Sequence, residues 1–457
     1  MKRKIISLML AVVLVLSFSL VTAVPVAGVH TPPGTIYVDA AFSGLEDGSL
    51  ATPFDTIGEA IAHATAGDTI SVAAGTYSVT AVIDVNVANL TISGAGAATT
   101  IVDGSGKDGI VIVDGSDVLF NVTANGVTIE NLTIDLGDDT TDFDVAVFTP
   151  TGIDDLTVQN NILLYAEAGN SIGEQLVHLG GGSGITITGN AFDVGSGNSM
   201  MYVGSGDIDS LTVSNNTAAP VGAPAGGAGD TDGGGTFFNQ FGPVTNSIIS
   251  GNTFTDTGIA VYLGSGATAT DNVSVTGNTF DSTSGFGSYG ALVITSEVNG
   301  AAIRNITVAN NTFSGTAAGG AITIFDTNGA GTPDVDGATI TINNNNFAGD
   351  NAVGGVVLGL GVSGTVDAEN NWWGAILGPY HATTNLASTG DEVSDSVDYS
   401  PWRDAAYPDG GNPRTYNVQN TTTSDTYNSI QDAIDAATAD DTISVAAGTY
   451  DEQVEID

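Results

Sequence analysis

Ile306-Thr307-Val308-Ala309-Asn310-Asn311-Thr312-Phe313 is the stretch of sequence that decides the fold. In it, an apolar–threonine–apolar triplet is followed by an asparagine and, two places on, by an aromatic residue. The pattern recurs eight times between Leu156 and Trp373, with small variations, and successive copies are 26 to 36 residues apart. A period of this length is typical of solenoid proteins, in which each repeat stacks on its neighbour.

One asparagine is aligned in every repeat and marks the same position of each predicted coil. The aligned residues are Asn161, Asn190, Asn216, Asn252, Asn278, Asn311, Asn345 and Asn371. Asparagine tolerates the left-handed backbone of a tight turn, and stacked asparagines can hydrogen-bond along the stack. We therefore predict an asparagine ladder at one corner, with Phe254, Phe280 and Phe313 stacked inside.

A second apolar segment, such as Ala291-Leu292-Val293-Ile294, lies between each asparagine and the next repeat. Each coil thus carries at least two short strands separated by turns. The strands of a sandwich pair antiparallel and do not return the same residue to the same corner, whereas stacked coils do. The predicted fold class is therefore all-β, a parallel β-helix. The capping box Thr56-x-x-Glu59 predicts a short helix that covers its first coil.

The N-terminal residues have the features of a signal peptide. Lys2, Arg3 and Lys4 precede an apolar run from Ile5 to Val21, and small residues lie near position 23. We expect residues 1–23 to be removed and 24–34 to be a linker, which places the protein outside the cell or on its surface. An uncleaved anchor is the alternative, and no later segment is apolar for long enough to span a membrane.

The charge balance is strongly acidic. The chain has 51 Asp and Glu against 7 Lys and Arg, a formal net charge of −44. This charge argues against nucleic acid and anionic membranes as partners and favours divalent cations, although solubility in salty water is an equally simple explanation. The sequence contains no cysteine, so disulfides and thiol chemistry are excluded.

The C-terminal part repeats the opening of the chain. Residues 441–450 are identical to residues 68–77, and the segment before them has the same helical spacing as residues 54–65. We predict a β-helix domain over 35–403, a linker over 404–415 and, over 416–457, the start of a second, incomplete β-helix unit. This organisation indicates either a truncated gene or part of a larger chain with several rods.

The opening and closing segments also resemble a known family. Tyr37-Val38-Asp39, the helix at 54–65 and the run from Asp68 to Tyr77 look like the N-terminal opening of pectin-lyase-like, right-handed parallel β-helix proteins. Asn370-Asn371-Trp372-Trp373-Gly374 resembles a closing segment of bacterial and archaeal surface proteins of this type. The resemblance covers about residues 35–403 and implies the fold. It does not decide function, because this fold serves lyases, hydrolases, adhesins and structural proteins.

The residues that an enzyme of this family would need are scarce. The resemblance implies basic residues that hold an acidic sugar, yet only Lys107, Arg304, Arg403 and Arg414 remain after residue 23. Arg304 alone lies within a repeat. His63, His178 and His381 show no spacing that suggests an orienting partner. We therefore predict no catalytic residue.

An acidic loop is the better candidate for a site. Asp326, Asn328, Asp334 and Asp336 offer oxygen ligands at close intervals in a glycine-rich segment, as calcium requires. A solvated loop is the alternative. The sequence thus favours a non-catalytic structural or adhesive surface protein that could use calcium and bind a polysaccharide or a cell-surface glycan. A polysaccharide lyase or glycoside hydrolase is the alternative function.

Overall fold

A computed structural model describes most of the chain. The described residues are 34–105, 112–113, 116–137, 144–164, 175–193, 199–219, 235–264, 269–283, 289–298, 300–316, 319–327, 333–386, 388–408, 411–414, 418–423, 425–427, 429–445 and 452–456. The expected signal peptide and the linker up to residue 33 lie outside them.

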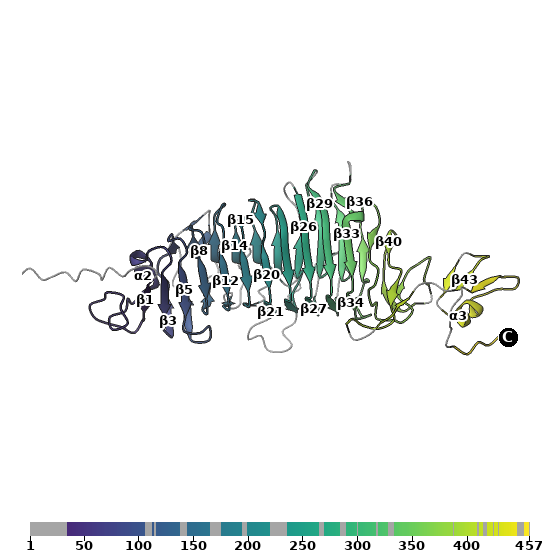
Figure 1. Ribbon diagram of the computed structural model, residues 1–457, viewed down its shortest axis with the longest axis horizontal. Coiled ribbons are helices and arrows are strands. Elements are labelled where there is room, and N and C mark those ends of the chain that lie inside the picture. The colour runs from purple at the N-terminus through teal and green to yellow at the C-terminus, as the bar shows by residue number, and fades with distance from the viewer. Residues whose placement is uncertain are drawn as a thin grey trace, which may run out of the picture.

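Three parallel sheets run side by side along an elongated rod (Figure 1). Sheet 1 consists of β1 (Thr35–Val38), β2 (Thr69–Val72), β5 (Thr91–Gly94), β9 (Thr128–Glu130), β12 (Thr157–Gln159), β15 (Gly182–Ser183), β16 (Thr186–Thr188), β19 (Ile208–Asp209), β20 (Thr212–Ser214), β23 (Val244–Ser250), β26 (Ala269–Thr276), β29 (Ala302–Ala309), β32 (Val335–Asp336), β33 (Ile340–Asn343), β36 (Val362–Ser363), β37 (Val366–Asp367) and β40 (Val397–Asp398).

The strands of sheet 2 are shorter, and those of sheet 3 lie between sheet 2 and the next turn of sheet 1. Sheet 2 consists of β3 (Gly75–Ser78), β6 (Thr100–Asp103), β10 (Thr133–Asp135), β13 (Ile162–Leu164), β17 (Ala191–Asp193), β21 (Thr217–Ala219), β24 (Thr253–Thr255), β27 (Thr279–Asp281), β30 (Thr312–Ser314) and β34 (Asn346–Phe347). Sheet 3 consists of β4 (Ile83–Val85), β8 (Ser116–Val122), β11 (Asp144–Thr149), β14 (Gln175–Leu179), β18 (Ser199–Val203), β22 (Thr236–Gln240), β25 (Val261–Leu263), β28 (Leu292–Ser296), β31 (Ile322–Asp326) and β35 (Val356–Leu358), with β7 (Ile112–Val113) antiparallel to β8.

These sheets confirm the predicted all-β, right-handed parallel β-helix fold. Parallel connections of this kind are right-handed in nearly all proteins. Each coil contains three strands, one more than the two that were recognisable in the sequence repeat. The third strand is the short segment after the ladder asparagine, such as β30, which is only three residues long. Its single inward residue is the aromatic one, so it shows almost no alternation in the sequence.

The turn between sheets 1 and 2 is a tight corner, which we call the asparagine corner. The residue before each ladder asparagine has positive φ, for example 54° at Asn215 and 58° at Asn310, and glycine occupies this place at Gly251 and Gly277. Asparagine and glycine adopt this conformation at little cost. The repeated corner keeps sheet 2 in the same register from coil to coil, so that Phe254, for example, lies beside Phe280.

The core of the rod is a continuous stack of side chains. The rings of Phe280 and Phe313 are nearly parallel, and the series continues through Phe347 to Trp373 with ring centroids 4.5 to 5.2 Å apart. All four rings are fully buried. They therefore form an internal column and not an exposed platform.

Each end of the β-helix is covered by a different device. At the N-terminal end, α2 (Ile57–His63) buries Ile57, Ala60 and Ile61 against the first coil, and Thr56 caps it by accepting a hydrogen bond from the Glu59 N–H. At the other end lie β38 (Pro379–Tyr380), β39 (Gly390–Glu392), β41 (Trp402–Arg403) and β42 (Pro413–Arg414), whereas η1 (Gly337–Thr339) lies between β32 and β33.

The C-terminal repeat of the opening sequence reproduces the capped helix of the opening but not its parallel strand pairing. It contains β43 (Val418–Asn420), β44 (Thr426–Tyr427), α3 (Ile430–Asp435) and β45 (Ile443–Val445). Val38 pairs with Val72 in parallel strands, whereas Val418 pairs with Val445 in antiparallel strands. Val72 is 1% exposed and Val445 is 42% exposed, because no coil among the described residues packs on β45 as β5 packs on β2.

Candidate functional site

The structure brings the eight ladder asparagines together at the asparagine corner. The backbone N–H and Nδ2 of Asn252 both donate to Asn278 Oδ1, at 2.9 Å each, and Asn278 donates in the same way to Asn311. Every Nδ2 also donates to a carbonyl oxygen of the preceding coil, such as Ile249 O for Asn278. The asparagines are buried and fully used in this network, so their role is structural.

The arginines described in the structure are engaged by groups of the chain itself. Arg304 Nε lies 2.9 Å from Asp271 Oδ2, and Asp271 is the residue paired with Arg304 in the neighbouring strand of sheet 1. A hydrogen bond from Asn305 and the contact with Arg304 hold the pKa of Asp271 below its usual value. Arg414 pairs with Asp404 at 2.9 Å, and Arg403 donates to the backbone carbonyls of Asn370 and Gly411. Lys107 lies outside the described residues.

The histidines among the described residues, His63, His178 and His381, lie far apart in the fold. His63 stacks on Phe54 at the end of α2. His381 Nδ1 accepts from the backbone N–H of Thr384, and its Nε2 lies 3.3 Å from Asp395 beside a cavity of about 370 Å³. With one ring nitrogen held by the backbone and the other by the carboxylate, His381 is tied into the closing segment. His178 lies on sheet 3.

The predicted calcium loop is only partly described. Asp326 Oδ2 accepts from the Asp334 N–H at 2.9 Å, Asp334 Oδ2 accepts from the Gly300 N–H, and Asp336 caps η1 through Ala338. Asn328 lies outside the described residues. Each of the three carboxylates thus accepts a hydrogen bond from a backbone N–H, and calcium binding here stays a prediction.

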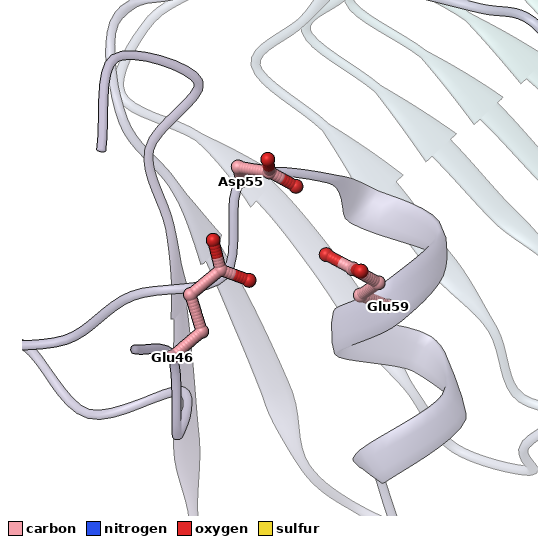
Figure 2. Close-up of side chains that lie close together, drawn as sticks. All are labelled: Glu46, Asp55 and Glu59. Atoms are coloured by element: carbon pink, nitrogen blue, oxygen red, sulfur yellow. The ribbon is translucent and has the colours of Figure 1, made fainter. Parts of the chain in front are cut away.

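A different trio of carboxylates lies close together at the N-terminal end. The ligand atoms of Glu46, Asp55 and Glu59 are all within 4.8 Å of one another, the one such group among the described residues (Figure 2). Burial, followed by the neighbouring Asp55, raises the pKa of Glu59. Glu59 also accepts from Thr56 Oγ1 as part of the helix cap. The helix cap accounts for the position of Glu59, and the side chains of Asp55 and Glu59 are exposed to solvent. The trio therefore needs no bound ion to explain its arrangement.

The outer face of sheet 3 carries a row of side chains, one from each coil, that the sequence did not reveal. We call it the outer row. Its members, paired in register from strand to strand, are Asn121, Phe148, His178, Tyr202, Asn239, Tyr262, Val293, Thr323 and Val357. The residues on either side in each strand, such as Val177 and Leu179, belong to the core, and those of the outer row do not.

Aromatic rings contact each other along this row. The His178 ring lies between Phe148 and Tyr202, with ring centroids 4.9 and 5.2 Å away. Farther along, Tyr289 lies between Tyr262 and Phe325 at 6.1 and 5.3 Å. Side chains of the row other than the buried Phe148, Tyr262, Val293 and Thr323 are half-exposed.

Polar groups accompany the rings. His178 Nδ1 lies 2.7 Å from Gln175 Oε1, and Asn239 Nδ2 donates to Ser199 Oγ at 2.8 Å. The Tyr262 hydroxyl donates to the Glu297 carboxylate, and burial together with Glu297 raises its pKa, so the hydroxyl keeps its proton. A surface that combines flat apolar rings with fixed polar groups is suited to ligands that are apolar on one face and hydroxylated at their edges.

No known family model matches the chain, and no curated protein is detectably similar to it in sequence. Among solved structures, pectate lyase Pel9A is similar at 16% identity, covering 84% of this chain and 93% of that one with a TM-score of 0.41. The catalytic domain of a GH87 alpha-1,3-glucanase gives 14% identity, coverage of 81% and 64%, and a TM-score of 0.40. The Dettilon tailspike protein gives 15%, 71% and 68%, and 0.33.

The described residues contain no helix with the length and apolar character needed to cross a bilayer.

Proposed function

We propose that this protein is a non-catalytic extracellular rod that binds a neutral polysaccharide along the outer face of sheet 3. The observation that carries the proposal is the outer row, in which the half-exposed rings of His178 and Tyr202 contact each other and His178 also packs on the buried Phe148. Parallel strands lie about 4.8 Å apart, so the row presents its groups at a regular spacing along the rod axis. A polymer with a regular repeat can meet such a row at several points.

The charge of the chain favours a neutral ligand over an acidic one. The formal net charge is −44, and the described arginines are engaged with groups of the chain. A polyuronate would approach a surface of its own sign without a cation to hold it. A neutral chain pays no such penalty and needs only ring faces and hydrogen-bonding groups. Calcium in the loop of Asp326, Asp334 and Asp336 is proposed to stabilise the rod and not to act on the ligand.

Affinity electrophoresis of the full chain in gels that contain neutral or acidic polysaccharides tests the proposal. We expect retardation in at least one neutral polysaccharide and none in pectate or alginate. Tyr202→Ala should weaken retardation by about fivefold, because a stacking aromatic contributes about 1 kcal/mol. Tyr37→Ala is the matched control, since Tyr37 is a half-buried tyrosine on sheet 1.

Three outcomes would contradict the proposal. One is the absence of retardation in every neutral polysaccharide, and another is a Tyr202→Ala variant that binds as well as the wild type. The third is release of unsaturated products from a polyuronate, followed by ultraviolet absorbance, which would favour the lyase alternative.

A further inference from the structure

The chain contains eight Asn-x-Ser/Thr triplets, the sequence that N-glycosylation requires. They begin at Asn89, Asn121, Asn131, Asn215, Asn272, Asn305, Asn310 and Asn420. In a repeat built from Asn-rich turns and Thr-rich strands such triplets arise easily, so the sequence alone does not distinguish acceptors from structural residues. The structure does, because the acceptor is the side-chain nitrogen Nδ2, whose surroundings differ among the eight.

Four of the eight nitrogens are already used. Asn420 is 1% exposed and donates to Asp441 Oδ2. Asn121 donates to Asp84, Asn272 donates to Asn246 Oδ1, and Asn305 donates to Asp271 Oδ1. Glycosylation replaces one of the two hydrogens of Nδ2, and a sugar on any of these nitrogens would crowd the partner of a hydrogen bond that links two coils or two strands. Asn131 is half-buried.

The remaining three, Asn89, Asn215 and Asn310, are exposed, and their side chains make no hydrogen bond with the described residues. All three have positive φ, between 54° and 58°, at the tip of a turn. A methyl group added at Gly251 would lie 2.7 Å from Asn215 Oδ1, and one added at Gly126 would lie 2.2 Å from Asn89 Oδ1. The oxygens of these two amides thus lie over glycines of the next coil, and the nitrogens on the other side of Cγ face away from those glycines.

Asn215 and Asn310 also share the asparagine corner, with Gly251 and Gly277 at the corresponding places of the coils between them. A methyl group added at Gly277 would meet only Gly251 N, at 4.0 Å, so no side chain fills the corner there. Space for a bulky substituent is therefore available along this edge of the rod.

We propose that Asn89, Asn215 and Asn310 are N-glycosylation sites. The reaction needs a lipid-linked oligosaccharide diphosphate as donor. Nδ2 of the asparagine forms a bond to the anomeric carbon of the first sugar, the bond from that carbon to the diphosphate oxygen breaks, and the amide loses one proton as the lipid diphosphate leaves. Export, expected from residues 1–23, would bring the chain to such a donor.

Asn215 and Asn310 lie away from the proposed polysaccharide-binding face on sheet 3. Their assignment as glycosylation sites does not require that face to bind a polysaccharide. Each coil has three corners, and the asparagine corner is the one between sheets 1 and 2, away from both edges of sheet 3. Glycans on Asn215 and Asn310 would thus leave the outer row uncovered. Removing them should leave polysaccharide retardation unchanged, so the two proposals can fail separately.

The test is glycopeptide mass spectrometry on the protein purified from the cells that produce it. We expect added sugar mass on the peptides that contain Asn89, Asn215 and Asn310, and unmodified Asn121 and Asn420. Thr217→Ala should remove the glycan from Asn215 and leave the one on Asn310. Unmodified Asn215 and Asn310 would overturn the proposal, and so would modification of the buried Asn420.

Asn160 provides a gain-of-site control within the same corner. It is exposed, has φ of 54°, and its Oδ1 lies over Gly189, as Asn215 Oδ1 lies over Gly251, but Ile162 stands where the triplet needs Thr. Threonine occupies the equivalent position of β21 and β30, so Ile162→Thr should fold normally. We expect this variant to gain one glycan at Asn160. An unchanged mass would show that exposure, positive φ and an Oδ1 over a glycine are not enough to make an asparagine of this corner an acceptor.

Discussion

The rings of Phe280 and Phe313 lie 4.5 Å apart between centroids, with planes 9° from parallel, although 33 residues separate them in the chain. The coil between Asn252 and Asn278 is only 26 residues long, yet the rings of Phe254 and Phe280 also contact each other, with centroids 5.0 Å apart and planes tilted by 41°. Coil length therefore varies without disturbing the column. The additional residues are placed in the turns and not in the three strands.

Phe313→Ala should lower the free energy of unfolding by about 3–5 kcal/mol, because the ring is fully buried between Phe280 and Phe347. Urea unfolding measures this loss. Since each coil contacts only its neighbours, we expect hydrogen-exchange protection to fall mainly in the coils of Phe280 and Phe347. Phe313→Leu should cost less, because more of the buried volume is kept. A uniform loss of protection along the rod would contradict this local picture.

Asn278→Ala should destabilise the rod more than its small loss of volume suggests. It leaves Asn252 N, Asn252 Nδ2 and Ile249 O without their partner in a buried corner. Each unsatisfied group costs about 1–3 kcal/mol. Asn310→Gly is the control, because it keeps the positive φ at an exposed turn and should change stability by no more than about 0.5 kcal/mol. Equal effects of the two substitutions would contradict a special role for the ladder.

Calcium should raise the melting temperature more than sodium chloride of equal ionic strength. A ligand that binds only the folded state stabilises it by about 2.7 kcal/mol at a hundredfold excess over its Kd. Asp334→Asn should reduce the difference between the two salts, since Asp334 lies in the predicted loop. Identical shifts in calcium and sodium would mean that the salts only screen the acidic surface.

Asp391 provides a test of pH dependence in the closing segment. Burial raises the pKa of its carboxyl, although hydrogen bonds from the Asn351 side chain and the backbone N–H groups of Gly349 and Asn351 act in the opposite direction. A raised pKa means that the folded state binds the proton more tightly than the unfolded state. The contribution to stability is therefore present at low pH and is lost as pH rises through the folded-state pKa.

We expect the wild type to gain stability relative to Asp391→Asn as the pH falls from about 7 to about 3, below the ordinary range for aspartate. Urea unfolding of both proteins at several pH values measures the difference, and general effects of the acidic surface cancel in it. A difference that shrinks with falling pH would show that the hydrogen bonds outweigh burial.

The fold could be predicted because its signal is repeated. Asn252, Asn278 and Asn311 each recur with an aromatic residue two places on, so a weak local pattern becomes strong when the copies are aligned. The cap formed by α2 was also predicted, since Thr56 and Glu59 have a fixed spacing with a known physical reason. Both features depend on neighbours in sequence or on exact repetition.

The outer row could not be found in this way. His178, Tyr202 and Tyr262 differ in chemistry, and only the register of sheet 3 places them in one row. The apolar segments that contain them, such as Met200-Met201-Tyr202-Val203, look like fully buried strands because two consecutive residues face inward before the outward one. A search of each strand for an aromatic residue just before its last apolar residue would have indicated the row.

The asparagine ladder runs in one direction. The backbone N–H and Nδ2 of each member, from Asn161 to Asn345, donate to the next coil, so a coil is completed only when the following one is in place. If the coils form in chain order, the most recently formed coil carries an amide group that still lacks its acceptor. Asn371 ends this series by donating to Ala368 O in its own coil, at 2.7 Å. The ladder therefore has a direction, set by the amide groups from Asn161 to Asn345, and Asn371 is the residue at which it ends.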